Sequence, residues 1–165
     1  MITEFDITLT SKDMYRFSMH HAYTRGQGIV SVIIALLCFF VAVKTHGSVE
    51  AMYTVLYAVF GVLFLFYIPV NLYLRTKRQF LLSEVLQNAL HYRVDEGGIH
   101  TSQNGESADL MWDQVYKMVS TRHNVLVYSS RVNAFVIPRD QIAEKYEVLR
   151  QVAKEHLADH RFKMK

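Results

Sequence analysis

The sequence predicts an α+β membrane protein, in which a hairpin of two transmembrane helices accompanies a small antiparallel β domain that ends in a helix. Three observations lead to this prediction. Residues 51–74 contain no charged side chain over 24 positions, residues 90–138 alternate between apolar and polar side chains, and the last segment has the period of an amphipathic helix. We therefore divide the chain into an N-terminal strand and helix, a transmembrane hairpin, a connecting helix and a β domain, in residues 1–25, 26–74, 75–89 and 90–165.

The N-terminal segment begins with the alternation of a half-buried strand. Its apolar face carries Phe5, Ile7 and Leu9. Because a lone strand is not stable in water, we expect this strand to complete the downstream sheet. Either Ser11 or Asp13 is predicted to cap the helix that follows, and this helix would direct Met14 and Phe17 toward the membrane.

Two apolar runs are predicted to cross the membrane. Residues 51–74 would form a helix about 36 Å long, which exceeds the roughly 30 Å of the hydrocarbon core. A buried helix of a soluble protein is the alternative, but such helices rarely lack charge over this length. The earlier run, residues 29–43, reaches membrane thickness only if its helix extends over about residues 26–47. A cleavable signal peptide is the alternative for this earlier run.

Small residues favour close packing of the two predicted spans. They share one face of each helix: Gly28, Ser31, Ala35, Cys38 and Ala42 on the first, and Ala51, Thr54, Ala58 and Gly61 on the second. Cations flank the spans: Lys12, Arg16 and Arg25 precede them, Arg75, Lys77 and Arg78 follow them, and only Lys44 lies in the connection. The positive-inside rule therefore predicts a multi-pass protein of the plasma membrane with both termini in the cytoplasm.

The rest of the chain is predicted to form a connecting helix, a β domain and a terminal helix. The connecting helix has an apolar stripe of Leu82, Val85, Leu86 and Ala89. Six short strands are expected around residues 90–95, 99–103, 108–112, 115–121, 124–130 and 133–138. The pair Asn104-Gly105 is a strong hairpin signal. Asp140 is predicted to cap the last helix, whose apolar stripe is Ile142, Tyr146, Leu149, Ala153 and Leu157.

Four sequence elements resemble the YcxB-like proteins of bacterial membranes. They are "FDITLTSKDMYRF" before the hairpin, and "VDEGGIHT", "LMWDQVYKMVST" and "AFVIPRDQI" after it, so the resemblance extends over essentially the whole chain. It implies a pleckstrin-homology-like (PH-like) cytoplasmic domain and no established biochemical activity. The strand count agrees, because six strands after the hairpin and one before it make seven, followed by the terminal helix.

Composition and motifs argue against several classes of function. Cys38 is the only cysteine, so an intrachain disulfide is excluded, and a net charge of +3 without a basic stripe argues against a nucleic-acid partner. Phosphate-binding loops and nucleophile elbows are absent from the sequence, and we predict no enzyme activity, catalytic residue or cofactor. His156 and His160 have the spacing of a zinc pair, but the adjacent glutamate and a third ligand are missing. We therefore predict no metal site, with a solvated helix end as the interpretation of these histidines.

Two functions remain for the predicted domain. The first is an interaction or scaffold module that presents a protein-binding surface at the inner leaflet. The alternative is an anionic lipid-headgroup reader that uses the cations Arg75, Lys77, Arg78, Arg122 and Arg131, with Arg139 as a further candidate. The acidic "VDEGG" turn and the topological role of the flanking cations favour the first. Expected partners are membrane lipids along the spans and a protein of unknown identity, and self-association stays open.

Overall fold

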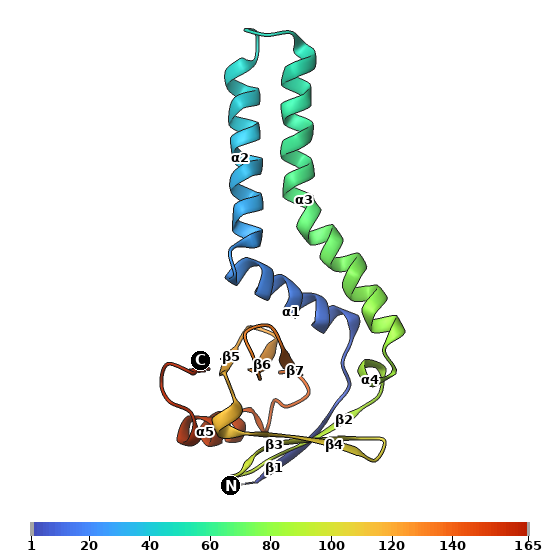
Figure 1. The fold of residues 1–165 in the computed structure, drawn as a ribbon, viewed down its shortest axis with the longest axis vertical. Coiled ribbons are helices and arrows are strands. Elements are labelled where there is room, and N and C mark those ends of the chain that lie inside the picture. Colours follow the sequence, from blue (N-terminus) through green and yellow to red (C-terminus); the bar gives the residue numbers. More distant parts are fainter. Residues whose placement is uncertain (1, 165) are drawn as a thin grey trace. The chain divides into compact units, whose positions relative to one another are not determined.

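The computed structural model describes residues 2–164, which form two compact units (Figure 1). We call Met1–Phe17 with Gln79–Lys165 the sheet unit, and Ser18–Arg78 the helical unit. The α-helices are α1 (Ser11–Thr24), α2 (Gln27–Thr45), α3 (Ala51–Leu82), α4 (Glu84–Gln87) and α5 (Tyr146–His156), with one 3-10 helix, η1 (Trp112–Gln114). The strands are β1 (Thr3–Ile7), β2 (Leu90–Val94), β3 (Gly98–Gln103), β4 (Glu106–Met111), β5 (Lys117–Ser120), β6 (Asn124–Tyr128), β7 (Ala134–Pro138) and β8 (Phe162–Lys163).

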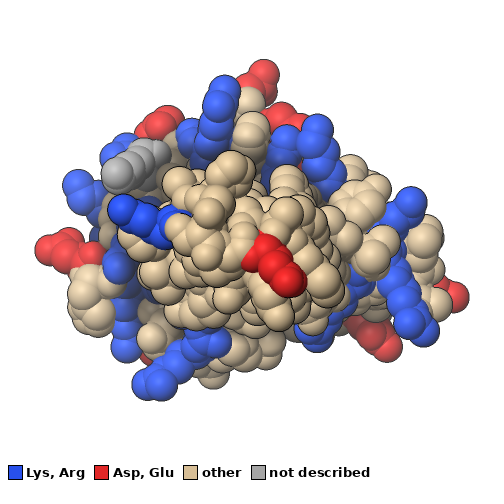
Figure 2. Space-filling view, turned by 90° about the horizontal axis from the view of Figure 1, so that it is seen from above, with Lys and Arg blue, Asp and Glu red and all other residues tan. Residues whose placement is uncertain are grey.

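The helical unit contains two helices, α2 and α3, that are long and apolar enough to cross a membrane. Two of the small residues that the sequence places on the facing sides of the helices, Ser31 and Gly61, contact the other helix. A Cβ atom added at Gly61 would come within 2.8 Å of the Phe39 ring, and the Ser31 hydroxyl donates a hydrogen bond to the carbonyl oxygen of Phe64. Pro69 lies inside α3, which bends in Figure 1. Figure 2 colours the charged residues and shows a central area of mostly uncharged side chains, with an acidic side chain within it and most Lys and Arg side chains around its rim.

The sheet unit contains two four-stranded sheets, with the orders β1-β2-β3-β4 and β7-β6-β5-β8. In the first sheet β1 pairs antiparallel with β2, and Ile7 lies opposite Leu90. This pairing confirms the prediction that the N-terminal strand joins the downstream sheet. All six strands expected after the hairpin are present. The structure adds β8, which pairs parallel with β5 and is too short to produce an alternating pattern.

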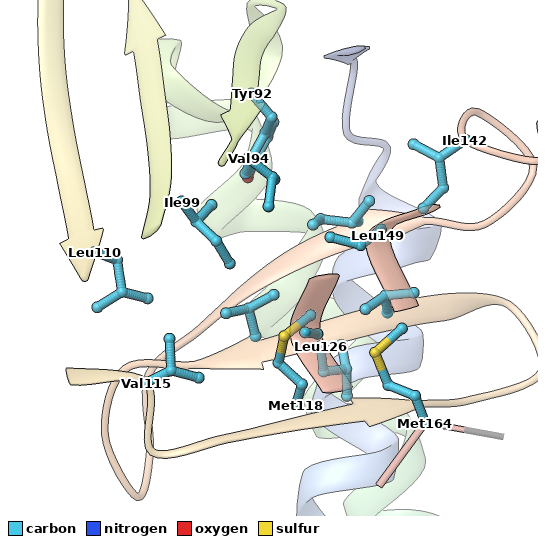
Figure 3. Packing of buried hydrophobic residues seen from close by; sticks show 14 of the residues in the cluster. Tyr92, Val94, Ile99, Leu110, Val115, Met118, Leu126, Ile142, Leu149 and Met164 are labelled. Carbon is cyan, nitrogen blue, oxygen red and sulfur yellow. The ribbon is translucent and has the colours of Figure 1, made fainter. Parts of the chain in front are cut away.

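One hydrophobic core joins the two sheets and α5. Figure 3 shows side chains of both sheets and of α5 directed toward one another, among them Ile99, Leu126 and Leu149, which are fully buried. The sheets remain separate and do not close into a barrel in the described part of the chain. All five residues of β6 are buried, so both faces of this strand are covered.

The apolar residues of the first turns of α1 belong to this core. Met14 and Phe17 pack against the cluster of buried residues, and the Phe17 ring lies 6.2 Å from that of Tyr128, centroid to centroid. The expectation that these two side chains point toward the membrane is therefore wrong. An amphipathic period identifies an apolar face, but it does not distinguish a protein core from lipid as the surrounding medium.

The helix starts differ from the predicted caps. The residue that caps α1 is Thr10, and not Ser11 or Asp13 as predicted. The backbone N–H of Asp13 donates to Thr10 Oγ1 at 3.3 Å, and the backbone N–H of Thr10 donates to Asp13 Oδ2 at 3.2 Å. This reciprocal pair is a capping box. Asp140 does not cap α5, because residues 139–145 form turns and the helix begins at Tyr146.

The connecting helix is interrupted. α3 continues to Leu82, the helix breaks at Ser83, and α4 is a single turn. Leu82 and Val85 are 76% and 58% exposed, and Ala89 is exposed beyond the end of α4, so the predicted apolar stripe is wrong at these three positions. Leu86 alone of that stripe packs against the core, because the break at Ser83 changes the direction of the following residues.

Candidate functional site

The first sheet ends in an open edge strand, β4. In the described part of the chain β4 pairs with β3 alone, and all of its residues except Leu110 are exposed. Side chains contact the opposite edge at two points. The Lys145 ammonium donates to the carbonyl oxygen of Glu4 in β1, and just beyond β1 the Gln141 side chain bonds both the N–H and the C=O of Thr8, at 2.9 and 2.8 Å. β4 therefore presents an open edge of this sheet.

The composition of β4 restricts which segments can pair with it. Natural sheets often block an exposed edge with charged side chains, especially Lys, with Pro or with a bulge. β4 has the sequence ESADLM, which contains no Lys or Pro, and its two carboxylates, Glu106 and Asp109, repel an acidic segment and leave the edge unblocked for a basic one. An acidic, unblocked edge is suited to an extended segment that carries positive charge.

A row of charged side chains crosses the exposed face of the same sheet. The strand register aligns Glu4, Arg93, His100 and Asp109 on four successive strands. The Arg93 Nε atom lies 3.8 Å from Glu4 Oε1 and 3.3 Å from Asp95 Oδ2. His100 Nδ1 lies 2.6 Å from Asp109 Oδ1, and its Nε2 lies 3.2 Å from Asp95 Oδ1. The row therefore links β4 to the rest of the sheet through continuous ionic contacts.

His100 is the titratable centre of this row. Its hydrogen bond to Asp109, opposed by desolvation and assisted by Asp95, raises the pKa of His100 above its ordinary value. Burial acts to raise the pKa of Asp95, but hydrogen bonds from the backbone N–H of Gly97 and from His100 outweigh it and lower that pKa. Trp112 donates its indole N–H to the Asp95 carbonyl oxygen at 2.9 Å. Both ring nitrogens of His100 therefore contact carboxylates, one on β4 and one in the turn after β2.

The cations predicted for lipid contact belong to two different units of the structure. Arg75, Lys77 and Arg78 are exposed on α3 within the helical unit. Arg122 and Arg131 belong to the sheet unit, where Arg122 precedes β6 and Arg131 follows it. A strand of five residues is about 17 Å long, so these two arginines lie at opposite ends of β6.

Other cations gather around Arg122, and we call this group the basic end of the second sheet. It comprises Lys12, Arg16, Arg122, His123 and Arg139. The backbone N–H of Arg139 donates to the His123 carbonyl oxygen at 2.8 Å. Desolvation and the positive charges of Arg16, Arg122 and Lys12 lower the pKa of His123. This group is not apparent from the sequence because its members come from α1 and from two strand ends more than 100 residues away.

The histidine pair considered for zinc is separated. α5 ends at His156, so His160 lies beyond the helix and the two side chains do not share a helix face. The His156 ring stacks on Trp112, with a centroid distance of 5.3 Å and an interplanar angle of 11°. Among residues 2–164, the structure has no group of three or more His, Cys, Asp or Glu residues that could hold a metal ion.

A family model described as YcxB-like protein matches residues 94–153, from the end of β2 into α5. Three of the four motifs that carry the sequence resemblance lie within this match, and the resemblance is thereby confirmed over these residues. Searches of curated proteins and of solved structures found no match.

Proposed function

We propose that this chain, with its YcxB-like segment, is a membrane-anchored interaction module. In this proposal α2 and α3 cross the plasma membrane, both termini are cytoplasmic, and the sheet unit is a PH-like domain. The domain binds an extended segment of a partner protein by strand addition along β4, at the inner leaflet. The open, unblocked edge of β4 is the observation that carries this proposal.

The pairing of β1 with β2 supports the membrane topology. These neighbouring strands directly precede and follow the helical segment in the chain, and they pair over five residues. Both ends of the helical segment must therefore return to one sheet, so the segment crosses the membrane an even number of times. Two helices of sufficient length and apolar composition meet this requirement.

The charge of the edge specifies the partner. Side chains alternate along a strand, so Glu106 and Ala108 lie on one side of β4, and Ser107 and Asp109 lie on the other. A partner strand that pairs with β4 would place its own side chains beside these carboxylates. We therefore expect an extended segment with Lys or Arg residues, held by main-chain hydrogen bonds and selected by opposite charge.

Photocrosslinking in native membranes tests this proposal. A photoreactive amino acid in place of exposed Ser107 should give one discrete protein adduct, and its crosslinked peptide should be basic. Introducing Ala108→Lys should abolish the adduct, because a cation on the edge repels a basic strand. Ala143→Lys is the matched control, since Ala143 is exposed and lies outside β4.

A synthetic peptide of the crosslinked segment then provides an equilibrium measurement. Its affinity for the purified full-length protein should fall by tenfold or more with Ala108→Lys and stay unchanged with Ala143→Lys. Adducts that survive Ala108→Lys, or a crosslinked surface that does not include β4, would show that the edge is not the binding site.

The basic end of the second sheet favours a second candidate function, which is binding of an anionic lipid surface. Each Lys or Arg close to such a surface contributes about 1 kcal/mol, so its four Lys and Arg residues would give substantial, salt-sensitive attraction. Hydrogen exchange of the full-length protein tests it. Exchange around residues 121–123 should be slower in nanodiscs containing phosphatidylglycerol than in phosphatidylcholine nanodiscs. Equal exchange in both lipids would eliminate this candidate.

A further inference from the structure

A small basic pocket lies at the edge of the second sheet, where β8 joins β5. Its volume is about 280 Å³. Its lining consists of Tyr116, Lys117, His160, Arg161 and Lys163, so four of the five side chains are basic and none is a carboxylate. We propose that this pocket binds a phosphate group, a function beyond the binding of a protein along β4.

The parallel pairing of β5 with β8 assembles the pocket. Met118 lies opposite Phe162, and Val119 lies opposite Lys163. Met118 is fully buried, so the alternation of the strand directs its neighbour Lys117 to the other face of the sheet. Lys163 belongs to the same side of the sheet as Val119 and Lys117. Two lysines that are 46 positions apart in the sequence thus line one pocket.

Arg161 and Lys117 are held in place by contacts that leave their charges unneutralised. The Arg161 guanidinium donates to the carbonyl oxygens of Asp113 and Val115, at 3.2 and 3.4 Å. The Lys117 ammonium lies 4.6 Å from the centre of the Tyr128 ring. These partners are uncharged, so they orient the two cations without forming an ion pair.

The pocket has an excess of positive charge among the described residues. In the described part of the chain, none of Lys117, Arg161 and Lys163 forms an ion pair with a carboxylate. The positively charged side chains repel one another, and the concave shape of the site concentrates their electric field in a small volume. A bound anion would relieve this repulsion, which makes the pocket selective for negative charge.

The chemistry and size of the pocket favour a phosphate group. Guanidinium and ammonium groups donate hydrogen bonds and cannot accept them, which suits a ligand that has only acceptors. A phosphate monoester carries about −1.5 to −2 charges at pH 7 and three acceptor oxygens, whereas a carboxylate carries a single charge. The volume, about 280 Å³, lies near the lower end of the range of small-molecule sites and accommodates a phosphate group.

The pocket is separate from the basic end of the second sheet. Lys117 is the first residue of β5, whereas Arg122 lies beyond the last residue of that strand. The phosphate can come from a lipid with a phosphomonoester headgroup or from a free phosphate compound, and the chemistry of the pocket is the same for both sources.

Calorimetric titration of full-length protein in phosphatidylcholine nanodiscs tests the proposal, with inorganic phosphate as the probe. Wild-type protein should show saturable binding. Lys117→Ala and Lys163→Ala should each weaken it by about tenfold or more, because each removes a charged donor to the phosphate. Lys154→Ala is the control, since Lys154 is exposed on α5 and does not line the pocket. Unchanged thermal unfolding of each variant, followed by Trp112 fluorescence, establishes that the variants are folded.

Two further lipid mixtures identify the source of the phosphate. If phosphatidic acid in the nanodisc blocks the titration and phosphatidylglycerol at the same mole fraction does not, the ligand is a phosphomonoester lipid. If both mixtures leave the titration unchanged, the ligand is a free phosphate compound. Absence of saturable phosphate binding in phosphatidylcholine nanodiscs would overturn the proposal. An equal loss of affinity with Lys154→Ala would also overturn it, because the attraction would then be a property of the whole surface.

Discussion

Replacing Ile7 by Ala should destabilise the entire sheet unit, although Ile7 lies in the short strand that precedes the helical segment. Its side chain is fully buried and faces the core that joins both sheets. Truncation of a buried Ile to Ala costs about 2–5 kcal/mol, from lost burial and from the cavity that remains. Domains of this size have a total stability of about 5–15 kcal/mol, so a large part of the stability depends on one β1 residue.

Trp112 provides the readout, because it is the only tryptophan and is buried in the sheet unit far from Ile7 in sequence. For a unit of roughly 100 residues, a loss of about 3 kcal/mol lowers Tm by roughly 12–24 °C. Thermal unfolding of the purified full-length protein, followed by Trp112 fluorescence, measures this change. Glu4→Ala is the control on the same strand, because Glu4 is exposed and its ion pair with Arg93 contributes at most about 1 kcal/mol.

Equal Tm values for Ile7→Ala and wild type would refute the reasoning. They would mean that β1 does not unfold cooperatively with the downstream strands. A lowered Tm in both Ile7→Ala and Glu4→Ala, by the same amount, would also contradict it, since burial distinguishes the two positions.

Three other predictions concern stability, pH dependence and topology. Gly98→Ala should lower the free energy of unfolding, measured in urea, by about 1–3 kcal/mol, because the added Cβ would collide with the backbone of β4. An unchanged free energy of unfolding would contradict the close packing of β3 on β4 at Gly98. The hydrogen bond between His100 and the β4 carboxylate of Asp109 raises the pKa of His100 above 6.5. Protonated His100 therefore stabilises the fold at low pH, and this stabilisation is lost as the pH rises through the folded-state pKa. His100→Gln should therefore cost more unfolding free energy at about pH 5.5 than at about pH 9, and a cost independent of pH would exclude the effect. In a Cys38→Ser background on spheroplasts, an impermeant maleimide should label Ser48→Cys and spare Ser102→Cys, and the reverse pattern would invert the topology.

Local sequence patterns predicted much of the fold because the physics that they report is local. The alternation of Phe5 and Ile7 identified β1 and the side of it that is buried. The pair Asn104-Gly105 identified the β3–β4 hairpin, and both residues adopt the positive φ angles, 51° and 86°, that such turns require. The lack of charge over residues 51–74 identified the apolar core of α3.

Features that depend on contacts between distant segments were not predictable in this way. The charged row through Arg93 and His100 exists because four strands adopt one register, which no single strand specifies. The turns before α5 include Gln141, whose side chain bonds the backbone of Thr8, a residue 133 positions away that a local helix signal at Asp140 does not report. Assembly of the phosphate pocket needs β8, whose two residues are too few to show a period.

The two proposed sites share a segment of the chain. β4 ends at Met111, and the next residues, in η1 and just beyond it, supply the carbonyl oxygens of Asp113 and Val115 that hold Arg161 in the pocket. A strand that pairs with β4 orders the start of this segment, and a phosphate bound by Arg161 orders its end. If binding at the two sites is coupled, bound phosphate changes the affinity of the protein for the β4 partner by some factor. Thermodynamic linkage then requires that the bound partner change the affinity of the protein for phosphate by the same factor. Titration of the crosslinked peptide with and without saturating phosphate measures this factor, and a factor of one would show that the two sites act independently.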